Sequence, residues 1–173
     1  MNRSIIFLGA TLLTLAGCSS SYKHNEFQKP EIQLNKNTGV LISTPKNGWY
    51  DDKEYRTSGR MTANEVRRAF SKNSRKVSIT TECDGDSCLD TIDSDTYGYY
   101  VQPIILHWED RATEWSGISD KLEIQIITFD SKTKKEIGNT TFSGESKWAT
   151  FGGDHPQDLL EEPINKYVEG LYK

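Results

Sequence analysis

The sequence predicts an α+β fold, an α/β sandwich in which a mixed, mostly antiparallel sheet carries helices packed on it. Two observations support this prediction. Short segments with alternating or continuous apolar residues, typical of strands, recur along the chain, and two segments repeat apolar residues at helical spacing. These segments follow one another in the order strand, helix, strand, loop, three strands, helix. We expect them to form a single globular domain over residues 38–173, without internal repeats.

The first half of this domain is expected to contain a strand, a helix and a second strand. Residues 40–42 are an apolar run that predicts a buried strand. Thr62 and Glu65 have the spacing of a capping box, which predicts that a helix of about ten residues begins there. The apolar residues on one face of that helix are Val66, Ala69 and Phe70. A second strand is predicted at 76–80, and the acidic segment 82–95 indicates an excursion on the surface.

The second half is expected to contain three strands and a closing helix. Residues 99–107 are apolar on both alternating sets, which is typical of a strand covered on both faces. Pro103 lacks a backbone donor and therefore indicates an edge or a bulge in that strand. Further strands are predicted over 121–130 and 137–148. The closing helix has apolar residues at Leu160, Ile164, Tyr167, Val168 and Leu171. Pro163 predicts a restart, as the first residue of a new helix.

An apolar run over residues 5–16 ends in Leu15-Ala16-Gly17-Cys18. A run of about 12 residues suits the apolar part of a signal peptide, whereas a spanning helix needs about 20. The alternative is an ordinary secretory signal with a chance cysteine, but the segment resembles the bacterial lipoprotein signal. The resemblance implies a signal peptide over 1–17 and a Cys18 that carries diacylglycerol and an amide-linked chain such as palmitate. Ser19, where an Asp is typical of retention at the inner membrane, implies the outer membrane, facing the periplasm.

Residues 18–37 form the lipidated N-terminus and, being polar and without periodicity, are expected to be a flexible tether. A tether of about 19 residues at 3.3 Å each would carry the domain up to roughly 60 Å from the membrane. The net charge of −4 comes without a basic block, which argues against nucleic acid and anionic headgroups as partners. We therefore expect the lipid anchor to supply the membrane affinity.

Once Cys18 is assigned to the lipid, Cys83 and Cys88 remain. In an oxidising compartment they are expected to form a disulfide that stabilises a local turn. A redox-active or metal-binding pair is the alternative. Redox motifs have two intervening residues where this pair has four, and two thiols alone make an incomplete zinc site.

The residues best suited to recognition lie in two clusters, one after the predicted strand at 99–107 and one before the closing helix. Aromatic rings beside charged groups favour a binding surface for a glycan or a partner protein. The candidate binding residues are His107, Trp108, Glu109, Arg111, Glu114, Trp115, Trp148, Asp154 and His155.

Three other interpretations of these clusters stay open. Glu109 and Glu114 have the residue type of a glycosidase pair. A metal site would use His107, Glu109, Asp154 and His155, but no HxH or HExxH spacing supports it, so we expect no metal and no cofactor beyond the covalent lipid. The structural interpretation places the tryptophans in the core and Asp154 at a helix N-cap.

Two segments resemble an uncharacterised family of proteobacterial lipoproteins, a domain of unknown function. They are HWEDRATEW within 104–117 and WATFGGDHPQDLL at 148–160. The order of elements is more loosely similar to accessory lipoproteins of exopolysaccharide export, of lipid transport and of peptidoglycan synthase activation, which are binding domains and not enzymes. The resemblance implies a non-enzymatic envelope lipoprotein that docks on an envelope protein complex or a glycan. The alternative is a periplasmic carbohydrate-active hydrolase using Glu109 and Glu114.

Overall fold

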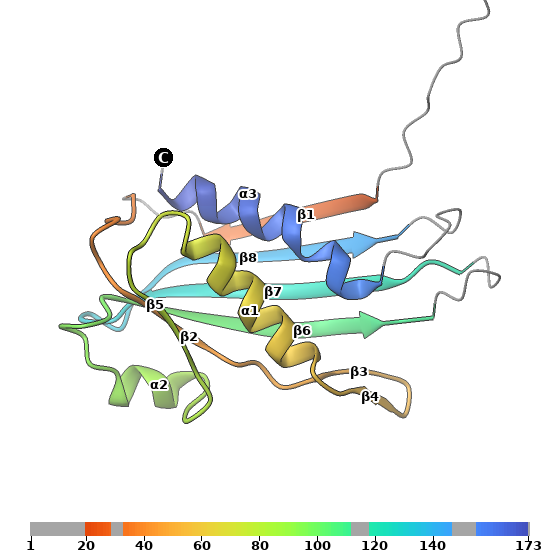
Figure 1. Cartoon of the computed structure of the whole chain (residues 1–173), viewed down its shortest axis with the longest axis horizontal. Helices are drawn as coiled ribbons and strands as arrows, with labels where there is room; N and C mark the ends of the chain where they lie inside the picture. Colours follow the sequence, from red (N-terminus) through yellow and green to blue (C-terminus); the bar gives the residue numbers. More distant parts are fainter. Residues whose placement is uncertain (1–19, 29–32, 112–117, 147–154, 173) are drawn as a thin grey trace, which may run out of the picture.

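Strands from both halves of the chain form one sheet, as the computed structural model shows for residues 20–28, 33–111, 118–146 and 155–172 (Figure 1). Within these residues the sheet has six strands in the order β1-β8-β7-β6-β2-β5. The pairs β1–β8, β8–β7 and β7–β6 are antiparallel, whereas β2 is parallel to both β6 and β5. Their bounds are β1 Ser21–Gln28, β2 Val40–Ser43, β5 Val77–Thr80, β6 Tyr99–Glu109, β7 Lys121–Asp130 and β8 Glu136–Glu145. The mixed, mostly antiparallel sheet predicted from the sequence is confirmed.

Two long helices cover one face of this sheet (Figure 1). They are α1 (Ser58–Phe70) and α3 (Glu161–Leu171), and a 3-10 turn, η1 (Pro156–Leu159), leads into α3. Apolar residues of both helices and of the inner strands form the main core between the layers. A short helix, α2 (Asp86–Thr91), covers part of the opposite face, where Cys88 and Leu89 pack on Tyr100. The surface excursion predicted for 82–95 therefore contains a helix with two buried residues.

The sheet has two distinct ends, which we call the hairpin end and the disulfide end. At the hairpin end the row Glu109, Lys121, Glu145 and Ser21 crosses the sheet, because β1 and β7 begin there while β6 and β8 end. The hairpin formed by β3 (Gly48–Tyr50) and β4 (Lys53–Tyr55) lies at this end (Figure 1). The disulfide end carries α2 and the turn between β7 and β8.

The prediction of a flexible tether is wrong for residues 21–28. They form β1, which pairs with β8 from Ser21 opposite Glu145 to Gln28 opposite Asn139. An edge strand of this kind is held by backbone pairing, so its polar sequence carries little of the alternation by which strands are recognised. Cys18 and the signal peptide lie outside the described residues.

The prediction that α1 begins at a Thr62–Glu65 capping box is also wrong. The helix begins at Ser58, after Thr57 in a left-handed conformation. Its first turn is held by contacts with the start of β3 and the residue before it: the Ser58 hydroxyl accepts the Gly48 N–H at 2.8 Å, and Asn47 Oδ1 accepts the Gly59 N–H at 3.2 Å. These contacts join residues at least ten positions apart, so local spacing could not show them.

A bulge in β6 decides which of its last side chains reach the core. The register with β7 shifts between Ile105 and His107. Pro103 is not part of this bulge: it keeps the regular register opposite Ile126 and lies beyond the residues of β6 that pair with β2. The shift places His107 opposite Glu123 on the open face, and Trp108 opposite Leu122 in the core. Trp108 is 2% exposed, so the prediction that it belongs to a binding surface is wrong.

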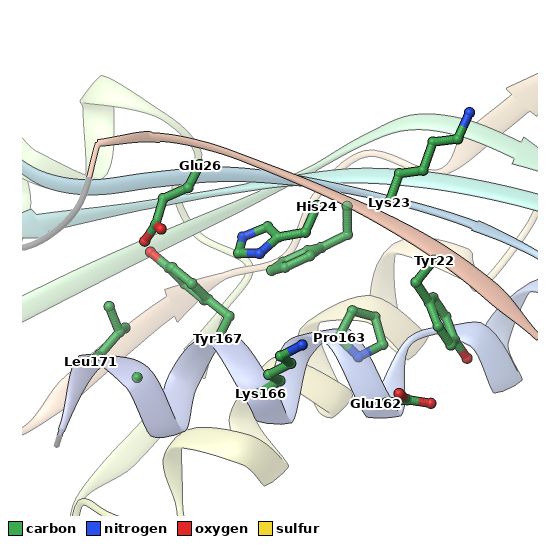
Figure 2. A pocket seen from close by; sticks show the side chains of 11 residues that line it. Tyr22, Lys23, His24, Glu26, Glu162, Pro163, Lys166, Tyr167 and Leu171 are labelled. Atoms are coloured by element: carbon green, nitrogen blue, oxygen red, sulfur yellow. The ribbon is translucent and has the colours of Figure 1, made fainter.

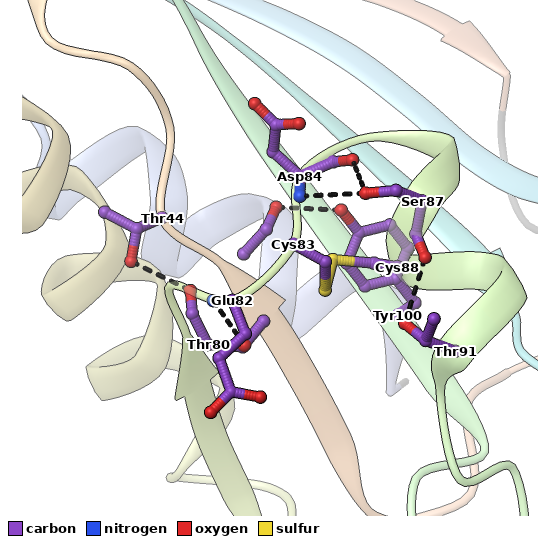
Figure 3. Close-up of a disulfide and its surroundings, with 10 residues drawn as sticks. Thr44, Thr80, Glu82, Cys83, Asp84, Ser87, Cys88, Thr91 and Tyr100 are labelled. Carbon is purple, nitrogen blue, oxygen red and sulfur yellow. Dashed lines mark hydrogen bonds between the residues drawn. A yellow bond between two sulfur atoms is a disulfide. The ribbon is translucent and has the colours of Figure 1, made fainter.

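Other boundaries differ by a few residues. β8 ends at Glu145, where the sequence predicted a strand to 148, and Pro163 is the third residue of α3 and not its first. The predicted disulfide between Cys83 and Cys88 is present, with 5.1 Å between the Cα atoms (Figure 3). It joins the loop after β5, which contains Cys83, to α2, which contains Cys88.

Candidate functional site

A groove of about 400 Å³ lies between β1 and α3. Figure 2 shows Tyr22, His24 and Glu26 pointing from β1 toward α3, whereas Lys23 points away from the helix. This arrangement follows from strand geometry, because alternate side chains point to opposite faces. The remaining lining residues come from β8 and α3: Phe142, Glu162, Pro163, Lys166, Tyr167, Gly170 and Leu171.

Several of the residues that α3 contributes to the groove lie on one face of the helix. Glu162, Lys166 and Gly170 are four residues apart and therefore share one face of the helix, next to the buried stripe of Pro163, Tyr167 and Leu171. A Cβ atom built on Gly170 would meet nothing within 4 Å, so the groove stays open at this point.

Aromatic rings form the floor of the groove. His24 stacks on Phe142 with ring centroids 4.8 Å apart, and Phe142 meets Tyr167 edge to face at 5.7 Å. His24 Nε2 lies 2.5 Å from Thr140 Oγ1, a hydrogen bond that fixes the imidazole ring. Burial raises the pKa of Tyr167 to about 12, so its hydroxyl keeps its proton at neutral pH. The floor thus combines flat apolar faces with a phenol that stays protonated.

The sequence-predicted residues that the structure describes lie elsewhere, at the hairpin end. Glu109 is 3% exposed and forms the centre of a network. Its carboxylate accepts hydrogen bonds from Arg111 Nε at 2.5 Å and pairs with His107 Nε2 at 2.9 Å. Arg111 also donates to the Tyr50 hydroxyl at 2.7 Å and lies over that ring.

The network decides the protonation state of Glu109. Burial alone would raise its pKa, but the hydrogen bonds from His107 and Arg111 and the Arg111 charge outweigh it and hold the pKa below its usual value. Glu109 is therefore ionised at neutral pH. A general acid of a glycosidase needs the opposite shift.

A second group at the hairpin end brings together Asp110, Asp120 and His155, whose ligand atoms lie within 4.8 Å of one another. His155 Nδ1 is 3.4 Å from Asp110 Oδ1, and the backbone N–H of Arg111 donates to Asp120 Oδ1 at 2.6 Å. Of the metal set considered from the sequence, His107, Glu109 and His155 are described, and of these three only His155 belongs to this group. The predicted residues Glu114, Trp115, Trp148 and Asp154 lie outside the described part of the chain.

Sequence reasoning missed the groove because it interpreted β1 as a tether. One signal was available: Tyr22, His24 and Phe27 are ring-bearing residues in a segment otherwise made of polar residues.

In the described residues no helix is long and apolar enough to cross a membrane.

Residues 32–171 match the family DUF4823, a domain of unknown function. No protein with a curated description matches the chain. The fold is similar to that of PelC from Paraburkholderia phytofirmans, solved as a dodecamer, with a TM-score of 0.69 and 11% identity over 87% of this chain and 97% of PelC. Protein XCC0632 from Xanthomonas campestris matches with a TM-score of 0.48 and 12% identity over 83% of this chain and 87% of that one. Lipoprotein GNA1162 from Neisseria meningitidis matches with a TM-score of 0.46 and 10% identity over 76% of this chain and 96% of that one.

At these identities the likeness to PelC shows a shared fold. The family match rests on the sequence itself and spans most of the chain, and it confirms the expectation of an uncharacterised family. The protein therefore belongs to the DUF4823 family.

Proposed function

We propose that this protein is a non-enzymatic envelope lipoprotein, acylated on Cys18, whose globular domain binds a glycan in the groove between β1 and α3. The proposal places the protein at the outer membrane, facing the periplasm, as the lipoprotein signal and Ser19 imply. The groove is the observation that carries the binding function, because its volume falls within the roughly 300–1,000 Å³ typical of small-molecule sites.

The chemistry of the groove favours a neutral, hydroxyl-rich ligand. Sugar rings present C–H groups on a face and hydroxyls at the rim, and the stacked rings of His24 and Phe142 offer an apolar platform for such a face. Three charged residues also line the groove and supply both hydrogen-bond acceptors and donors: Glu26, Glu162 and Lys166. Charges of both signs are present, so a strongly anionic or cationic ligand gains less here than a neutral polar one.

The structure offers the hydrolase alternative little support. A glycosidase needs two carboxylates, one of them with a raised pKa. Glu109, the described member of the suggested pair, has a lowered pKa and is enclosed by Arg111 and His107. A glycan-binding domain without catalysis therefore fits the described residues better.

The test uses the acylated full-length chain in detergent micelles and saturation-transfer NMR with two probes, soluble peptidoglycan fragments and neutral oligosaccharides. Gly170→Leu places a side chain into the open part of the groove, and Gly170→Ala is its matched control. Both changes favour the helix, so both variants should fold. We expect transfer to at least one sugar class with the wild type and Gly170→Ala, and its loss with Gly170→Leu.

Two results would contradict the proposal. One is the absence of transfer to either probe, and the other is equal transfer with Gly170→Leu. If a photo-crosslinker in place of Lys166 instead captured one envelope protein reproducibly, the groove would be a protein-docking site.

A further inference from the structure

The position of β1 limits how far the protein body can stand from its lipid anchor. Ser21, the first residue of β1, follows Cys18 by three residues. A chain spans at most about 3.6 Å per residue, so Ser21 lies within roughly 11 Å of Cys18. Because Ser21 belongs to the hairpin end of the sheet, acyl chains on Cys18 would hold that end at the bilayer surface.

The same end carries exposed apolar side chains. Among the described residues, four large hydrophobic side chains are at least 40% exposed: Trp49, Met61, Leu106 and Ile118. Each belongs to an element or loop of the hairpin end: Trp49 to the β3–β4 hairpin, Met61 to the first turn of α1, Leu106 to the last part of β6, and Ile118 to the loop before β7. Trp49, at 57%, is the most exposed of the four. Tryptophan is a residue that prefers the interface between water and lipid.

The charges of the two ends also favour the hairpin end as the side that faces the membrane. Residues 51–60, at the hairpin end, contain three acidic and three basic residues, so this region has no net charge. Residues 82–95, at the disulfide end, contain six acidic residues and no basic one. The β7–β8 turn at the same end adds Lys132, Lys134 and Lys135, and the first two pair with Asp95 and Asp90. Residues 82–95 and 131–135 together therefore keep a net charge of −3. A lipid surface with anionic headgroups would repel the disulfide end and tolerate the hairpin end.

We propose that the hairpin end is a membrane-contacting surface, with Trp49 and Ile118 set in the interface of the leaflet that holds the acyl chains. This inference rests on the acylation of Cys18 in the proposed function, and it names the surface by which the body docks on lipid. The contact is apolar, so it does not require anionic lipids. β1 begins at the hairpin end and runs toward the other end of the sheet, so the groove along β1 would extend away from the bilayer.

The test uses the acylated full-length chain reconstituted into phosphatidylcholine vesicles, with and without phosphatidylglycerol. The photo-crosslinking residue p-benzoylphenylalanine takes the place of Trp49 in one variant and of Ile118 in a second. The matched control carries it in place of Lys132, an exposed side chain at the disulfide end. Mass spectrometry counts lipid adducts at each position, and the mass of the N-terminal peptide reports acylation of Cys18 in the same sample.

We expect lipid adducts at positions 49 and 118 to exceed those at position 132 by about tenfold or more, in both vesicle types. Equal adduct yields at the two ends, on a chain with acylated Cys18, would overturn the orientation and leave the proposed function intact. A requirement for phosphatidylglycerol would also overturn it, because the contact would then be one of charge. A chain without acyl groups on Cys18 would overturn both proposals.

Discussion

The hairpin end of the sheet carries the exposed hydrophobic side chains, whereas the disulfide end carries acidic side chains around a covalent link. At the hairpin end, Trp108 fills the core beneath β3, and a Cβ atom on Gly48 would come within 2.5 Å of the Trp108 Cβ. At the disulfide end, α2 contributes Cys88 and Leu89 to a small cluster on Tyr100. The first end is held by packing around one large side chain, and the second by a disulfide over a small apolar contact.

This difference shows that the two ends of one small domain are stabilised in different ways. The hairpin end can expose apolar side chains because a buried tryptophan and the Glu109 network stabilise it from within. The disulfide end needs no large core, because the covalent link limits the freedom of the segment that carries α2. The acidic surface of that end keeps it solvated.

The largest expected effect is on the packing of the hairpin end. Trp108→Ala should lower the free energy of unfolding by about 3–5 kcal/mol, because it leaves a cavity beneath the hairpin. Urea denaturation measures this loss. Trp49→Ala is the matched control and should cost no more than about 0.5 kcal/mol, since its side chain is largely exposed. Equal costs for the two variants would contradict the core position of Trp108.

The next effect concerns the disulfide end. Replacing both cysteines, Cys83→Ala with Cys88→Ala, should lower the free energy of unfolding by about 2 kcal/mol, the chain-entropy value for so short a loop. Reductant should destabilise the wild type by a similar amount and leave the double variant unchanged. If the double variant unfolded at the same urea concentration as the oxidised wild type, the disulfide would not stabilise α2.

A smaller and pH-dependent effect is expected from Glu109. Glu109→Gln keeps the shape of the side chain but removes its charge, and should cost about 1–2 kcal/mol at neutral pH. The folded-state pKa of Glu109 lies below the ordinary value of 4.5, so its charge stabilises the fold above that pH and loses this contribution as the pH falls through the folded pKa.

The difference in stability between wild type and Glu109→Gln should therefore stay constant at neutral and weakly acidic pH and shrink below pH 4.5. Denaturation at a series of pH values measures it. A difference that grew on acidification would show that the pKa of Glu109 is raised, as in a general acid.

Strands with apolar alternation could be predicted from the sequence, and β2, β5, β6 and β7 occur close to where they were expected. The helices were predicted by their apolar stripes, but the start of α1 was not. Thr62 and Glu65 satisfy a local rule, whereas the chain uses Asn47 and Gly48 to fasten the first turn. Contacts between distant residues overrode the local pattern.

The candidate site was less predictable. The bulge in β6 exchanges the faces of His107 and Trp108, and a shift of one residue cannot be located from a run that is apolar on both sides. The groove depends on β1, whose partner β8 lies more than a hundred residues away. The aromatic floor of the groove depends on this long-range pairing, so it could not be predicted from the sequence.

The structural claim on which both proposals depend is that residues 21–28 belong to the sheet. Hydrogen–deuterium exchange on the acylated chain in vesicles tests it most directly. We predict that backbone amides of β1 facing β8 exchange slowly, with protection close to that of β8 itself. Exchange of the whole segment at the rate of an unstructured peptide would contradict the account, because the groove would lose a wall and the body would be free to leave the bilayer.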